Sequence, residues 1–251
     1  LRLFPALLAV CLVMVAVGTE WSRVVPTLGL YANYARIDGL HLGRLTHTWF
    51  IAVIAHFYLL WPLVIGWLPA RHRIRVVGGL ALVAVLWRAV AIGVMSPGWV
   101  YNATDTNAAA LFVGGYLAVA GPTNSRAVVK WSVPGLLALM LLPVFGDDGR
   151  AVLWGGFVAL TLSAMAVTYT STGPVWLEHR VLVRVAEVSF GLYLWHYVFI
   201  RSDIPLWAAL VLTAAATGAS WFLVEQPVLR LDAKLRNRSS TSRRTTIPAH
   251  L

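Results

Sequence analysis

Apolar runs of roughly 20 residues recur along most of this chain, and no other feature limits its fold as strongly. A helix needs about 20 apolar residues to cross a bilayer core of about 30 Å, so runs of this length are typical of membrane spans. We therefore predict an all-α fold, a polytopic transmembrane helical bundle with eight spans present. The candidate spans are residues 3–18, 48–68, 76–95, 109–121, 131–145, 150–171, 186–201 and 206–224.

The composition excludes an ordinary soluble domain. Charged residues make up 12% of the 251 residues, against about 25% in soluble domains, and the mean hydropathy is +0.74. The net charge of +10 would point to nucleic acid in a soluble protein, but in a membrane protein lysine and arginine mark the cytoplasmic loops. Cys11 is the single cysteine, so we expect no internal disulfide and no cysteine-rich metal site. We also expect no other metal and no bound cofactor.

Positive charge is concentrated on one side of the predicted spans. Most of the 20 lysine and arginine residues fall in segments that share that side: 71–75, 126–130, 180–184 and 230–244. The positive-inside rule then places both termini of this sequence in the cytoplasm, and we expect an integral protein of the cell membrane. The first apolar run also resembles a signal peptide, but the later spans need a first span to set their topology, so we favour a span.

Arg88 and His56 are ionisable side chains inside spans, where such groups point to function by default. Arg88 could clamp an anionic group such as a phosphate or carboxylate, or it could pair with a carboxylate or carbonyls of another helix. We favour the clamp because no span offers an obvious acid partner. His56 could accept a proton, although a hydrogen-bonded packing role is the simpler interpretation.

The segment of residues 19–47 is the longest between spans before the tail, and we expect it outside the membrane. His47 ends this segment, so it is better placed than His56 to meet a water-borne substrate, unless it is a solvated loop residue. The side chains that could line the mouth of a cavity here are Tyr31, Asn33, Tyr34, Asp38, His41 and His47.

The run from Ser189 to His196 places polar groups in an apolar span. Ser189, Tyr193 and His196 are spaced i, i+4 and i+7, so on a helix they share one face, which should turn toward other helices or a wet cavity. They either line a site or join helices by hydrogen bonds. At the end of the last span, Glu225 is expected to accept backbone or arginine hydrogen bonds where Pro227 stops the helix.

Several of these stretches together resemble the integral-membrane acyltransferase family 3, whose members O-acylate sugars and other acceptors. The run Ser189 to His196, with Trp195, is similar to that family's S-[YF]-x-[LI]-Y-L-W-H segment, and Val224 to Pro227, with Glu225, looks like its closing V/I-E-x-P motif. The remaining matches are His47, Trp49, Phe57 and Tyr58 in its H-x-W-S-L-x-x-E-x-x-F-Y-L-L-W-P span, residues 101–118, and Arg2 to Pro5 at the end of its basic loop.

The sequence also departs from the family pattern. The serine and the glutamate of the tryptophan-containing span are Phe50 and Ile54 here, and the family's R-x-D reads Asn107, Ala108, Ala109. The resemblance implies ten spans, of which the first two, with the histidine–carboxylate pair to which catalysis is attributed, would precede Leu1. We therefore expect residues 1–230 to be one acyltransferase-3-like domain that is inactive alone, and residues 231–251 to be a basic, disordered cytoplasmic tail.

The resemblance implies an O-acyltransferase that moves an acyl group from a cytoplasmic acyl-CoA-type donor to a hydroxyl of a carbohydrate or envelope lipid. The expected substrate-binding residues are Arg2 at the donor's phosphates, with Arg88, His47, Tyr193 and His196 at the cavity, and the main catalytic base is expected in the preceding spans. Residues of the family motif are expected to be structural, namely Trp49, Phe57, Tyr58, Ser189, Trp195 and Glu225.

Other functions remain open from the sequence. The replacements Ile54, Asn107 and Ala109 favour, as an alternative, a catalytically degenerate relative that binds, carries or scaffolds an envelope precursor. A solute transporter is less favoured because the two halves show no repeat. The sequence carries no P-loop, Rossmann, zinc-protease or nucleophile-elbow motif, so it supports none of those activities.

Overall fold

A computed structural model of the chain describes residues 3–121, 178–232 and 234. All regular secondary structure in these residues is helical, which confirms the all-α prediction for this part of the chain. The predicted spans 131–145 and 150–171 lie outside the described residues, as do Arg2 and nearly all of the basic tail.

Three helical segments in the described residues are long and apolar enough to cross a membrane: Gly43–Trp67, Ala70–Val94 and Leu206–Asp232. A shorter apolar helix covers Leu3–Ala16. These segments coincide with four of the predicted spans and indicate an integral membrane protein. The counts of eight and ten spans stay predictions.

The chain divides into two compact units. Unit 1 comprises residues 1–28, 43–45 and 180–251, and unit 2 comprises residues 29–42 and 46–179. The helices of unit 1 are α1 (Leu3–Ala16), α2 (Trp21–Leu28), α10 (Arg180–Ile200), α11 (Leu206–Ser220) and the π-helical turn η3 (Trp221–Glu225).

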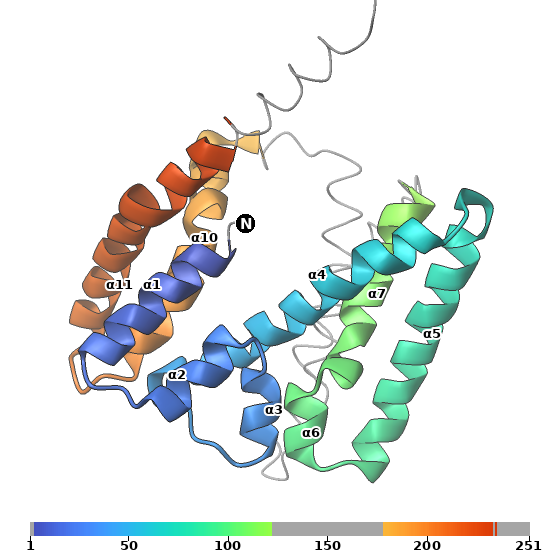
Figure 1. Cartoon of the computed structure of the whole chain (residues 1–251), viewed down its shortest axis with the longest axis horizontal. Coiled ribbons are helices and arrows are strands. Elements are labelled where there is room, and N and C mark those ends of the chain that lie inside the picture. Colours follow the sequence, from blue (N-terminus) through green and yellow to red (C-terminus); the bar gives the residue numbers. More distant parts are fainter. Residues whose placement is uncertain (1–2, 122–177, 233, 235–251) are drawn as a thin grey trace, which may run out of the picture. The chain divides into compact units, whose positions relative to one another are not determined.

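In unit 1, α10 packs along α11, and α1 contacts both α10 and η3 (Figure 1). The face that α10 buries consists of Gly191, Leu194, Trp195 and Val198, at helical spacing. A glycine and three apolar side chains on one face allow close packing between helices in a bilayer, where small residues and van der Waals contact drive association.

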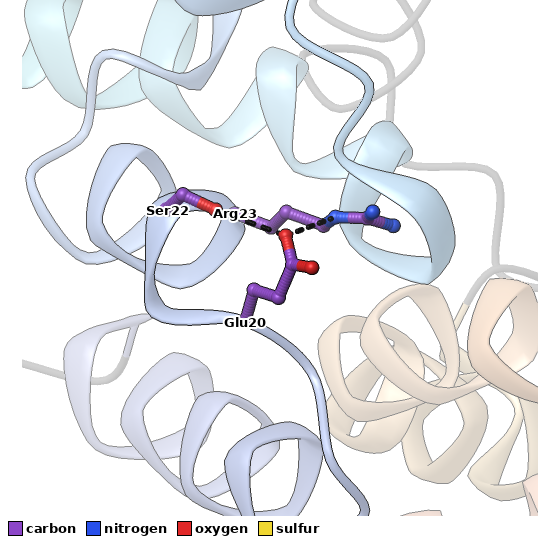
Figure 2. A network of polar contacts seen from close by, with 3 residues as sticks. All are labelled: Glu20, Ser22 and Arg23. Atoms are coloured by element: carbon purple, nitrogen blue, oxygen red, sulfur yellow. Dashed lines mark hydrogen bonds and ion pairs between the residues drawn. The ribbon is translucent and has the colours of Figure 1, made fainter.

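A small polar network marks the start of α2. The Ser22 hydroxyl donates to Oε2 of Glu20 at 3.3 Å, and Nε of Arg23 lies 3.5 Å from the same oxygen (Figure 2). A carboxylate at a helix N-terminus is favoured by the helix dipole. The pair is exposed, so its contribution to stability is small.

The expectation that Pro227 stops the last helix is wrong. Helical backbone continues from Leu206 to Asp232, with η3 interposed, where the N–H of Gln226 bonds to the carbonyl of Trp221 five residues back. A π-turn shifts the backbone hydrogen-bond pattern by one residue. This irregularity lets the helix continue past a proline, which lacks an N–H and disturbs a regular α-helix.

Unit 2 is built from five helices in the described residues: α3 (Ala32–Ile37), α4 (Trp49–Trp67), α5 (Ala70–Val94), α6 (Pro97–Asn102) and α7 (Thr104–Ala120). The 3₁₀ turn η1 (Gly43–Thr48) leads into α4. Helix α5 packs along α7, and α7 also contacts α4. The short helices α3 and α6 contact each other at the end where α4 and α7 begin and α5 ends (Figure 1).

Local sequence explains how α5, α6 and α7 are connected. Pro97 occupies the first turn of α6, and the Ser96 hydroxyl caps that turn by accepting from the N–H of Trp99 at 3.3 Å. Proline and serine are favoured at these two positions because the first helical N–H groups lack internal partners.

Further along α7, Gly115 faces Trp61 of α4, so the absence of a side chain permits their close contact.

Candidate functional site

Polar side chains from separate parts of the chain meet at the α3–α6 end of unit 2. Nδ1 of His56, on α4, lies 2.8 Å from Oγ1 of Thr104, the first residue of α7. Asn33, on α3, donates from Nδ2 to the same hydroxyl at 3.0 Å. We call Asn33, His56, Arg88, Thr104 and Asp105 the polar cluster.

The start of α7 is held to α6 by its own side chains. The Thr106 hydroxyl lies within hydrogen-bond distance of the carbonyls of Val100 and Ala103, at 3.0 and 3.1 Å. Nδ2 of Asn107 donates to the carbonyls of Tyr101 and Ala103, at 3.0 and 2.8 Å. These bonds satisfy carbonyls at the corner between α6 and α7, and they fix the position of Thr104 and Asp105.

The carboxylate of Asp105 accepts hydrogen bonds from neighbouring N–H groups. Its Oδ2 accepts from the indole N–H of Trp87 at 2.8 Å and of Trp99 at 3.3 Å. Its Oδ1 accepts from the backbone N–H of Thr106 at 2.8 Å. Three N–H donors stabilise the ionised carboxylate and join α5, α6 and α7 through one side chain.

Arg88 is 2% exposed, on the face of α5 that meets α7. Its Nη1 donates to the carbonyl of Thr106 at 2.8 Å and lies 3.5 Å from Oδ1 of Asn107. A carbonyl partner on another helix was one of the two alternatives for Arg88, and that contact is present. Its role as an anion clamp stays a prediction.

Aromatic rings of α3, α4 and α6 pack at the same end of unit 2 as the polar cluster. Tyr34 lies against His56, with ring centroids 6.1 Å apart, and meets Trp99 at 6.2 Å. Trp49 packs on Tyr101 at 4.7 Å, and the Arg36 guanidinium carbon lies 5.8 Å from the centre of the Tyr101 ring. Tyrosine and tryptophan combine an apolar body with a polar tip, which suits the boundary between a membrane and water.

The predicted substrate-binding residues fall in different units. His47, in η1 of unit 2, is only 7% exposed, so it is not a solvated loop residue. Tyr193 and His196 lie on α10 in unit 1. Arg2 lies outside the described residues. The contribution of all four residues to a substrate site stays a prediction.

The polar stripe of α10 is held by local bonds. The Ser189 hydroxyl donates to the carbonyl of Ala186 at 2.9 Å, and Nδ1 of His196 donates to the carbonyl of Tyr193 at 2.7 Å. Bonds to the preceding helical turn can satisfy polar groups of side chains in an apolar span. A carbonyl oxygen can only accept, so this bond places a proton on Nδ1 of His196.

Three motif residues contribute to packing. Phe57 stacks on Trp61 with ring centroids 5.1 Å apart, and Trp195 stacks on Phe199 at 6.1 Å. Glu225 is 2% exposed, and its Oε1 accepts from the Ser220 hydroxyl at 3.5 Å.

Two other motif residues, Trp49 and Tyr58, lie on α4. Trp49 begins α4. Tyr58 is exposed, on the outer surface of the same helix.

The residues that replace the family pattern lie in or beside the packed interior. Ile54 is half-buried on α4, and Ala109 is buried on α7. Asn107, where the pattern has arginine, bonds to the corner carbonyls and lies beside Arg88. A guanidinium from α5 therefore stands next to the position from which the family pattern would supply one on α7.

Sequence reasoning did not find Thr104 as a site residue, and it assigned His56 to packing. Asn33 and His56 are 71 and 48 residues from Thr104 along the chain. No spacing rule joins such positions. The signal available was the polar run Thr104 to Thr106 immediately before an apolar span, which is the pattern of a helix start.

An apolar groove of about 630 Å³ also lies between α5 and α7. Arg75 is its charged lining residue, and Tyr116 borders it on α7. It contains no member of the polar cluster, so it is not the candidate site. In the described residues, no group of three or more His, Cys, Asp or Glu side chains could hold a metal ion.

A model of a protein family described as an acyltransferase domain matches residues 1–225. O-acetyltransferase OatA of Staphylococcus aureus is 28% identical, covering 84% of this chain and 39% of the relative. Peptidoglycan O-acetyltransferase OatA of Listeria monocytogenes is 25% identical, covering 79% and 38%. Putative peptidoglycan O-acetyltransferase YrhL of Bacillus subtilis is 27% identical, covering 73% and 34%. The chain thus spans less than two fifths of each relative's length, and no solved structure matches it.

Proposed function

The chain belongs to the acyltransferase family that it matches over residues 1–225, and on this premise we propose that it is an integral-membrane O-acyltransferase of the cell envelope. The acyl group is acetyl, and the acceptor is a hydroxyl of peptidoglycan or a closely related glycan. The names of the relatives, O-acetyltransferase and peptidoglycan O-acetyltransferase, support both choices.

The polar cluster is the proposed acceptor end of the site. This choice rests on two ionisable side chains that contact the start of α7: the buried Arg88, which donates to the Thr106 carbonyl, and the half-buried His56, which bonds to Thr104. Ionisable groups held inside a span are costly and are typical of substrate pathways. A cation and N–H donors can stabilise the negative charge that develops on an acyl oxygen during transfer.

The orientation of unit 2 follows from its charges. Arg71, Arg73 and Arg75 lie in the first turns of α5, while the polar cluster lies near the last turns. A helix of 25 residues is about 37 Å long, enough to cross the membrane. With the arginines on the cytoplasmic side, as the positive-inside rule requires, the polar cluster faces outward, toward the glycan.

The donor is proposed only as an acyl ester or thioester. An acyl-CoA-type donor stays a prediction, because no described residue specifies the donor. A donor on the cytoplasmic side and an acceptor outside would require the acyl group to cross the membrane within the protein. Two helical segments of unit 2 are long enough to cross the membrane, as such a path requires: the segment that ends with α4 at Trp67, and α5.

The second candidate is a degenerate relative that binds an envelope precursor without transferring an acyl group. Ala109, which is buried, and Ile54, which is half-buried, favour it, because neither side chain can move a proton. The two candidates differ in one observable, the appearance of a new O-acyl ester on the glycan.

Expression of the full-length protein, with any spans that precede Leu1, in a host that lacks wall O-acetylation tests the proposal. Mass spectrometry of the digested glycan should show the added acetyl mass on a sugar hydroxyl, and mild alkali should release it. The Arg88→Ala variant should lose the product, whereas Arg71→Gln, an exposed arginine at the other end of α5, should retain it. Glycan binding without any acetylated product in the wild type would select the second candidate.

A further inference from the structure

His56 belongs to a hydrogen-bond chain whose direction can be worked out. The chain runs from Asn33 through Thr104 to Nδ1 of His56, over 3.0 and 2.8 Å. A hydroxyl has one hydrogen to donate and two lone pairs that accept. The Thr104 oxygen already accepts from Asn33, and the described residues offer its hydrogen one acceptor, Nδ1 of His56.

This arrangement sets the tautomer of the imidazole. If Thr104 donates to Nδ1, the neutral ring carries its proton on Nε2. With Nδ2 of Asn33 as the donor to Thr104, the reverse arrangement, with Nδ1–H donating, would leave the Thr104 hydrogen without an acceptor among the described residues, in a partly buried site, which costs free energy. The first arrangement is therefore the more stable one.

Within the described part of the chain, Nε2 of His56 is available to a ligand. The Tyr34 ring is stacked beside the imidazole, with ring centroids 6.1 Å apart and an interplanar angle of 30°. His56 is half-buried, and Nε2 has no hydrogen-bond partner among the described residues. The nearby carboxylate of Asp105 already accepts from two indoles and a backbone N–H.

We propose that His56 acts as a neutral hydrogen-bond donor, whose Nε2–H binds the carbonyl oxygen of the acyl group that is transferred, rather than as the general base. This proposal rests on the acyltransferase function proposed above. A neutral N–H inside a membrane span binds an oxygen most strongly when that oxygen becomes negative, because the surroundings have a low dielectric constant.

The corresponding step balances without a proton on His56. The acceptor hydroxyl oxygen attacks the acyl carbon, a new C–O bond forms, and the carbonyl electron pair moves to the oxygen bound by Nε2–H. Collapse of this oxyanion breaks the bond to the donor, whose leaving group departs with that bond's electron pair. The hydroxyl proton passes to the leaving group, directly or through water, and His56 neither gains nor loses a proton.

Glutamine separates a donor from a base, because its amide N–H can stand near the position of Nε2 but cannot take up a proton. His56→Ala should lower kcat by about 10²- to 10³-fold, with KM little changed, as for other oxyanion donors. His56→Gln should retain kcat within about tenfold of the wild type. Equal losses in the two variants would overturn the donor role. His72→Gln, at the opposite end of unit 2, is the matched control and should be unaffected.

The role of Thr104 has its own comparison. Thr104→Ser keeps the hydroxyl and should keep kcat, whereas Thr104→Val removes the donor to Nδ1 and should lower kcat about tenfold while leaving KM unchanged. An equal effect of serine and valine would show that Thr104 contributes only packing.

Nitrogen-15 NMR of histidine-labelled protein measures the tautomer independently of activity. The His56 signals, assigned by difference from His56→Gln, should show a protonated Nε2 and an unprotonated Nδ1 at neutral pH. A protonated Nδ1 would overturn the inference even in an active enzyme. A wild type that has the expected tautomer but transfers no acyl group would instead refute the proposed function. That outcome would also refute the acyl carbonyl as the ligand of His56.

Discussion

Gly191 on α10 leaves the space that the carboxylate of Glu225 occupies: a methyl group at position 191 would lie 3.2 Å from Oε1 of Glu225 and 3.2 Å from Cγ2 of Thr217. Glu225 is almost fully buried. The glycine therefore determines how closely α10 can approach the π-turn that carries the glutamate.

Gly191→Ala should destabilise unit 1 by about 1–3 kcal/mol, because the added carbon crowds two neighbours in a packed interior. Thermal unfolding in detergent measures the loss. Gly218→Ala on α11, where a Cβ would meet nothing within 4 Å, is the control and should not destabilise. Shortening the acid in Gly191→Ala/Glu225→Asp should restore part of the stability, and strictly additive losses would contradict the contact.

Arg88→Met should destabilise unit 2 by about 1–3 kcal/mol, since it removes the donor to a buried carbonyl at the start of α7. Arg88→Lys keeps the charge and one donor, so its loss should be smaller, although lysine cannot reproduce the planar fork of arginine. Thermal unfolding of both variants in detergent checks the order. Arg75 is an exposed arginine on the same helix, so the stability of Arg75→Met should stay close to that of the wild type. If Arg88→Met were as stable as the wild type, the contact of Arg88 with Thr106 would be refuted.

Asp105→Asn should destabilise unit 2, although asparagine has nearly the same size as aspartate. The amide replaces one acceptor oxygen by a donor, which then faces either the two indole N–H groups or the N–H of Thr106, at a cost of about 1–3 kcal/mol. Trp99→Phe removes the longer of the two indole bonds and should cost less than Trp87→Phe. Denaturation midpoints in the reverse order would show that ring packing, not the carboxylate, decides stability here.

Gly115→Ala should destabilise the contact of α4 with α7, because the new carbon would clash with the indole ring of Trp61. Overpacking of this kind costs about 1–3 kcal/mol. Gly79→Ala on α5, in open space, tests whether helix glycines are sensitive in general, and it should be neutral or slightly stabilising. The smaller side chain of Trp61→Leu should rescue the alanine variant, and failure to do so would place the strain elsewhere.

Sequence reasoning located most helices of the described residues by apolar length. The span predicted at 48–68 matches α4 within one residue at each end. Helix α5 begins at Ala70 rather than at residue 76. Its first turns carry arginines, which can be helical at the membrane surface because their long side chains extend the charged groups into water. The short helices α2 and α3 were not predicted, since six to eight residues give too little periodicity to recognise.

Individual site residues were predictable only where composition alone marks them. Arg88 stands out because arginine is rare inside a span. Thr104 is an ordinary residue in sequence, and Asn33 was expected only as one of six side chains at the mouth of a cavity. Only the approach of α3, α4 and α7 gives His56 a directed hydrogen bond. Pro227 misled because its effect depends on the π-turn before it, which no local propensity indicates.

The shared carboxylate of Asp105 has a consequence for how this protein can be observed. Trp87 and Trp99, on α5 and α6, donate to the same oxygen, so a displacement of either helix changes the electrostatic environment of both indoles. These two of the 12 tryptophans thus form an intrinsic fluorescent reporter beside His56. Occupation of the polar cluster can be followed through their emission, without any label.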